Sequence, residues 1–195
     1  MQNIFISCGH NNARNWGKDE NGRLVLWMSK DQWAVNPLDK EQTEYRWVYR
    51  VATSLQKLTN VVNPSYNYIF VPAGLNLADR IKWINKNSKA GDICIELHMN
   101  AGWGSGIEVF CMAWAPYAHK KATELSSIMS SSMGLYNRWA KIDTNTRFWR
   151  LWFIRDTKPL AFLIELWFID NAHDRDVVWV KGASALKLAL WTIKF

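Results

Sequence analysis

Two histidines follow predicted strands, at positions where a side chain can take part in chemistry. His98 closes an alternating apolar and polar run, residues 93–98 (ICIELH), that begins after Gly91 and Asp92. Alternation bounded by turn residues predicts a strand. His10 follows a second predicted strand, residues 3–7. Open α/β sheets bind ligands at the carboxyl ends of their strands, so both imidazoles are candidates for one site.

Two carboxylates lie at comparable positions. Glu44 is near the start of an apolar stripe on a predicted helix, and Glu165 ends a predicted strand. Two histidines and one carboxylate form a zinc ligand set that leaves a fourth position for water. Other interpretations stay open on spacing alone: structural histidines, an ion-paired Glu165, and a Glu44 that favours the helix dipole, which Glu41 would do equally well.

The elements that must position these residues alternate along the chain. This alternation predicts an α/β fold: a single three-layer domain over residues 1–195, with a mixed, mostly parallel sheet flanked by helices. Residues 11–37 and 134–150 are expected to be polar connections. The expected strands are 3–7, 68–71, 92–98, 106–112, 151–154 and 161–166, and the expected helices are 38–58, 77–87, 116–133 and 183–193.

The composition narrows the classes of partner. A net charge of +7 favours polyanions. The lysines and arginines are scattered rather than clustered in a stripe or arm, so we expect no nucleic-acid partner, and a diffuse positive charge suits an anionic cell-wall polymer equally well. No apolar run is long enough for a membrane span, and the first residues lack the features of a secretory signal. We expect a monomer made in the cytoplasm, with Cys8, Cys94 and Cys111 as reduced core thiols.

Four short motifs in a fixed order carry a family resemblance. They are residues 4–10 (IFISCGH), the helix with Glu44, residues 95–100 (IELHMN) followed by 106–110, and Asn137-Arg138 followed by 159–165 (PLAFLIE). Together they resemble the zinc-dependent N-acetylmuramoyl-L-alanine amidases, which include bacterial cell-wall amidases and phage endolysin catalytic domains. The resemblance spans nearly the whole chain.

The resemblance implies a reaction and roles for four residues. One Zn²⁺ would be held by His10, Glu44 and His98, and Glu165 would act as the general base. Glu44 is preferred to Glu41, because a ligand at position 41 would put the polar Glu44 on the core stripe. The substrate would be peptidoglycan, cut at the amide between N-acetylmuramic acid and L-alanine.

Three further residues have two interpretations each. Glu96 either orients a metal ligand or pairs with a surface cation. Asn100 either contacts substrate or shapes its loop. Arg138 either contacts substrate or, like Arg80, forms a structural ion pair.

The expected absence of a signal peptide favours a phage endolysin, made in the host cytoplasm and acting at the cell wall. Two alternatives remain: another zinc-dependent peptidoglycan peptidase, and a non-catalytic, tryptophan-rich module that binds the wall or its glycan.

Tryptophan is unusually frequent, with 13 residues against 10 glycines. The family resemblance expects glycine at Trp139 and Trp167, and six more tryptophans lie where glycine would be unsurprising. One hypothesis is that these codons are UGA, read as glycine in the source organism; the alternative is a real sugar-stacking surface. The eight positions are Trp16, Trp103, Trp114, Trp139, Trp149, Trp152, Trp167 and Trp191.

Overall fold

A computed structural model describes residues 1–10, 16–18, 21, 24–26, 35–36, 39–58, 63–146 and 150–195. Its centre is a six-stranded sheet in the order β6-β1-β7-β10-β8-β9. The first four of these strands run parallel, and β8 and β9 run in the opposite direction. The strands are β6 (Tyr66–Phe70), β1 (Gln2–Cys8), β7 (Ile93–Asn100), β10 (Leu160–Phe168), β8 (Ile107–Cys111) and β9 (Asn137–Ile142).

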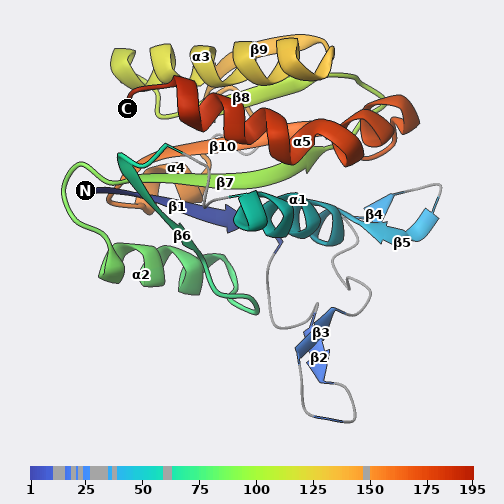
Figure 1. The fold of residues 1–195 in the computed structure, drawn as a ribbon, viewed down its shortest axis with the longest axis horizontal. Coiled ribbons are helices and arrows are strands. Elements are labelled where there is room, and N and C mark those ends of the chain that lie inside the picture. Colours follow the sequence, from blue (N-terminus) through green and yellow to red (C-terminus); the bar gives the residue numbers. More distant parts are fainter. Residues whose placement is uncertain are drawn as a thin grey trace.

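Helices cover both faces of this sheet (Figure 1). On one face lie α1 (Glu44–Leu58), α3 (Pro116–Met133) and α5 (Ala172–Thr192). On the other lie α2 (Leu77–Asn87) and α4 (Trp152–Asp156). Alternating strand residues supply the two cores: in β1, Ile4 and Ile6 face the first group of helices, and Phe5 faces the second. The predicted three-layer α/β fold is confirmed.

Side-chain and backbone caps fix the ends of three helices. Asn76 and Asn171 precede α2 and α5, and the side chain of each accepts a hydrogen bond from the backbone N–H three residues on. Gly134 ends α3 in the left-handed conformation. None of the described helices is long and apolar enough to cross a membrane.

Four boundaries differ from the sequence-based expectations. Residues 152–154 form part of helix α4 and Leu151 caps it, so the expected strand 151–154 is wrong, because a short apolar run fits either structure. The expected connection 134–150 contains the edge strand β9. Helix α1 begins only at Glu44, after strand β5 (Asp39–Thr43), and α5 begins at Ala172, well before residue 183.

Two small hairpins interrupt the predicted loop 11–37. One pairs β2 (Trp16–Lys18) with β3 (Leu24–Leu26), and the other pairs β4 (Val35–Asn36) with β5. Apart from Asn21, the rest of that predicted loop lies outside the described residues.

Candidate metal centre and proton-transfer site

Neighbouring parallel strands bring the two histidines to the same edge of the sheet. Strands β1 and β7 pair in register up to Cys8 and Leu97, so His10 and His98 follow at the same level. The Gly9 N–H donates to the Leu97 carbonyl oxygen at 2.8 Å and holds the turn against β7. The imidazole rings meet edge to face, with their centroids 5.5 Å apart.

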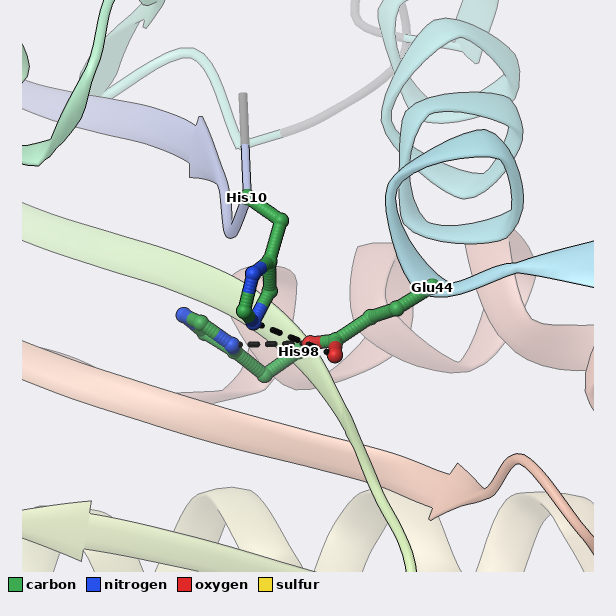
Figure 2. Close-up of side chains that lie close together, drawn as sticks. All are labelled: His10, Glu44 and His98. Carbon is green, nitrogen blue, oxygen red and sulfur yellow. Dashed lines mark hydrogen bonds and ion pairs between the residues drawn. The ribbon is translucent and has the colours of Figure 1, made fainter. Parts of the chain in front are cut away.

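The Glu44 carboxylate contacts both rings from the same side (Figure 2). Its Oε1 is 2.8 Å from His98 Nδ1, and its Oε2 is 3.2 Å from His10 Nε2. Glu44 is the first residue of α1, and the backbone N–H of Met99 donates to its Oε1 at 2.9 Å. A buried carboxylate is thus fixed against two imidazole nitrogens.

The three side chains fit a metal ion. One donor atom from each of His10, Glu44 and His98 can be chosen so that all three lie within 4.8 Å of one another. Ligands of one tetrahedral Zn²⁺ are roughly 3.3–3.5 Å apart, so small side-chain rotations complete the geometry. Two imidazoles with one carboxylate suit zinc better than Ca²⁺ or Mg²⁺, which prefer oxygen ligands. The residues predicted as metal ligands are therefore brought together.

The electrostatics of this cluster follow from burial and close opposite charges. Burial acts to raise the pKa of Glu44, but the neighbouring histidines and the Met99 N–H outweigh it and the pKa is lowered. Burial acts to lower the pKa of His98, but hydrogen bonds to Glu44 and Glu96 raise it well above the usual value. Because a metal needs the free imidazole nitrogen, metal binding here would release a proton.

A buried ion pair supports the far side of the His98 ring. Glu96 Oε2 is 2.9 Å from His98 Nε2, the nitrogen that does not contact Glu44. Glu96 Oε1 accepts hydrogen bonds from Arg80 at 2.8 and 2.9 Å and from the Ser7 hydroxyl at 3.2 Å. Both Glu96 and Arg80 are buried, so the cation is not a surface one. Glu96 therefore contacts a candidate metal ligand directly.

Glu165 lies on β10, the strand next to β7, in register with His98. Its Oε2 is buried and has no hydrogen-bond partner among the described residues. Burial, with the nearby Glu44 and Glu108 charges, raises the pKa of Glu165 to about 8, against the lowering effect of His98 and His10. An unpaired carboxyl group that titrates near neutral pH has the properties of a general acid or base.

Glu108 of β8 holds the two predicted substrate-binding residues. It lies opposite Glu165 across the β8–β10 pair. Its Oε1 accepts from Asn100 Nδ2 at 2.7 Å, and its Oε2 accepts from Arg138 Nε at 2.8 Å. The Arg138 guanidinium also lies 4.9 Å from the ring centre of Phe168. Both residues thus have structural contacts, and their contact with substrate stays a prediction.

Sequence reasoning gave no role to Glu108. The available signal was a carboxylate inside an otherwise apolar strand, residues 107–111 (IEVFC). A buried charge needs partners, but the sequence does not show that Asn100 and Arg138 supply them.

Comparisons with known proteins decide the family. The family model described as N-acetylmuramoyl-L-alanine amidase matches residues 4–181. The chain belongs to this family. The amidase family acts on peptidoglycan, and the hydrolase expected from the motifs is thereby confirmed. No curated protein matches the amidase sequence.

Solved structures share the fold of this amidase at low identity. The catalytic domain of the CD27L endolysin, targeting Clostridia difficile, is 22% identical with a TM-score of 0.67, covering 97% of this chain and 94% of that one. The catalytic domain of CwlV from Bacillus (Paenibacillus) polymyxa is 19% identical with a TM-score of 0.69, covering 97% and 94%. The CwlD amidase from Clostridioides difficile is 15% identical with a TM-score of 0.71, covering 98% and 95%.

Proposed function

We propose that this amidase is a zinc enzyme in which Glu165 transfers the proton that amide hydrolysis requires. The observation that carries the proposal is the placement of Glu44 against His10 and His98, with the unpartnered Glu165 on the adjacent strand. The bond cut would be the amide between N-acetylmuramic acid and L-alanine. The family assignment supports this choice of bond.

His10, Glu44 and His98 would bind the metal ion, and Glu165 would transfer the proton. Zn²⁺ in such a site supplies Lewis acidity to the attacking water and the scissile carbonyl. Glu165 takes a proton from the water as it attacks and then gives that proton to the departing nitrogen. An amide nitrogen is a poor leaving group unless protonated, so this second transfer allows the C–N bond to break.

The environment of Glu165 suits both steps. A group with a pKa near the working pH is present in both protonation states and can accept and donate without a large energetic cost. Burial raises the pKa of Glu165 to about 8, which brings it into that range. Glu44 and Glu96 differ, because close positive partners keep the pKa of each carboxyl group low.

The biological setting we propose is that of an endolysin, made in a host cytoplasm and acting on the wall as a monomer. The net charge of +7 suits an anionic wall, and the CD27L catalytic domain shares the fold. Expression of the protein inside a bacterium whose wall it degrades tests this setting. Lysis should wait until the membrane is permeabilised; lysis without permeabilisation would contradict the proposal.

Replacing the Glu165 carboxylate with an amide tests the mechanism. Glu165→Gln should keep the fold and bound zinc but lower the rate of wall hydrolysis by about 100-fold or more. The wild-type products should be intact glycan strands and stem peptides with a new N-terminal L-alanine. New amino groups on other stem residues would instead identify a peptidase. Glu124→Gln, which removes the carboxylate that pairs with Lys121 within α3, serves as the control and should leave the rate unchanged.

A further inference from the structure

Three tryptophans have a backbone conformation that suits glycine. Trp103, Trp114 and Trp139 have φ values of 61°, 61° and 67°, and His10 is the only other non-glycine residue with positive φ in the described part of the chain. Bulky side chains rarely adopt this left-handed region, because Cβ approaches the following carbonyl oxygen. All three belong to the eight positions at which the sequence suggested glycine.

The local structures are ones that glycine commonly serves. Trp103 follows Gly102, itself at φ 120°, in the loop after β7. Trp114 lies in the turn that joins β8 to α3. Trp139 lies where the β8–β9 register shifts, because residues 137–140 of β9 oppose residues 107–109 of β8. Bulges are rare in parallel pairs such as β8–β9, and the G1 class of bulge has a glycine in this left-handed conformation.

The side chains at these positions contribute little packing. Trp103, Trp114 and Trp139 are 69%, 95% and 57% exposed. Trp47 and Trp83, both in helices, behave differently: Trp47 packs edge to face with Trp179 at 4.8 Å, and Trp83 packs with Phe5 at 6.2 Å. The left-handed tryptophans therefore adopt an unfavourable conformation while most of each side chain stays exposed.

These three residues do not form one sugar-binding surface. Trp103 follows β7, whereas Trp114 follows β8, which runs in the opposite direction. Their loops therefore lie at opposite ends of the strands of the sheet. Trp139 lies on the outermost strand, β9. A single glycan strand cannot stack on all three rings through one face of the protein.

We propose that residues 103, 114 and 139 are encoded by UGA and that the source organism inserts glycine there. Each glycine would occupy the left-handed conformation without steric cost. The proposal does not require glycine at position 167, where the indole is fully buried and packs against Trp47. The Trp167 indole N–H has no hydrogen-bond partner among the described residues, so that site is unusual for a different reason.

The gene sequence gives the first test. The three codons should all be UGA, while those of Trp47, Trp83 and Trp179 should be UGG. A UGG codon at any of positions 103, 114 and 139 would overturn the proposal. Mass spectrometry of the protein from its own organism should show glycine in the peptides that contain these three positions, and tryptophan there would overturn it equally.

Stability measurements test the structural reasoning independently. The triple variant Trp103→Gly, Trp114→Gly and Trp139→Gly should melt higher than the tryptophan form, by on the order of 5–10 °C. Trp83→Gly is the matched control and should melt lower, because it removes a packed ring from a helix. If the triple variant also melts lower, the proposed strain is absent.

Further substitutions separate relief of strain from removal of exposed apolar surface. Asparagine tolerates the left-handed region and alanine does not. The melting temperature should therefore fall in the order glycine, asparagine, alanine at each position. Equal gains for the three substitutions would contradict the proposal. Binding to purified peptidoglycan should be retained by the triple glycine variant, and its loss would favour the sugar-stacking alternative.

Discussion

Glu96 and His98 contact each other through the imidazole nitrogen that does not face Glu44, with Glu96 Oε2 2.9 Å from His98 Nε2. This contact fixes the ring so that Nδ1 points to the metal-binding side. A carboxylate in this position also increases the basicity of the imidazole. Arg80, on α2, neutralises and holds that carboxylate. The metal centre is thus supported by Arg80 and Glu96 from the α2 side of the sheet, whereas Glu44 reaches it from α1 on the other side.

We expect Glu96→Gln to weaken zinc binding by roughly 10–100-fold, because an amide accepts a weaker hydrogen bond than a carboxylate. Competition with a chromogenic chelator measures this. The same variant removes the negative charge that pairs with the buried Arg80, so the protein should also lose about 3 kcal/mol of stability. Adding Arg80→Met should restore part of the stability but not the zinc affinity. An affinity equal to wild type in the folded variant would refute the role of Glu96.

Gly9→Ala should disrupt the metal site directly. A Cβ at position 9 would lie 2.2–2.4 Å from the His98 ring atoms, so the imidazole must move. We expect weaker zinc binding and slower wall hydrolysis, each by at least about 10-fold. Gly91→Ala is the control: its φ of +86° makes the substitution strained, but no atom lies near the added Cβ. That variant should lose stability and keep its zinc affinity.

Asp92 should contribute stability that depends on pH. Burial acts to raise its pKa, but hydrogen bonds from the Asn3 and Lys89 backbone N–H groups and the Asn3 side chain outweigh it, so the pKa lies below the usual 3.8. The stabilisation is therefore present above pH 3.8 and is lost as the pH falls through the lowered value.

Asp92→Asn should consequently cost about 1–3 kcal/mol at pH 7, because its amide NH₂ cannot accept these bonds. Urea unfolding at a series of pH values should show the difference from wild type shrinking below about pH 4. The exposed Asp176→Asn serves as a control with little effect. A difference that stays constant down to pH 2 would show that Asp92 acts through packing alone.

The three cysteines should be unreactive in the folded protein. All are free and buried, and burial raises the pKa of the Cys8 and Cys94 thiols to about 12 and that of Cys111 to about 11. Only the thiolate reacts readily with a disulfide reagent. At pH 8 we expect all three thiols to react slowly with a disulfide reagent in the folded protein and rapidly in denaturant. One thiol that reacts rapidly without denaturant would contradict the buried position.

The sequence predicted the central strands and the metal ligands because local pattern and function coincide there. Strand β7 shows a clear alternation that ends in His98, and β1 ends at the Gly9-His10 turn. Sheet geometry then requires parallel neighbours to bring their carboxyl ends together. The position of Glu44 was predictable from its helix and the family motif, although the helix start was not.

Features that depend on tertiary contacts were not predictable. Residues 151–154 have an apolar pattern that fits a strand or a helix, and packing of Phe153 and Ile154 against the second core selects the helix. Strand β9 has no apolar alternation that would predict it from the sequence. It is an edge strand, and its pairing with β8 defines it. The first turn of α5 is polar and Gly182 lies inside the helix, so the sequence pattern predicted the helix only from residue 183 onward.

The position of β10 has a consequence for synthesis. This strand lies between β7 and β8, although it begins about sixty residues after β7 ends and about fifty after β8 ends. A nascent chain that has left the ribosome only as far as α3 contains His10, Glu44 and His98 but lacks the strand that carries Glu165. Its sheet would have a gap at the centre. A ribosome-bound fragment of this wall-degrading enzyme is therefore expected to be inert, and proteolysis would remove it more readily than the finished protein.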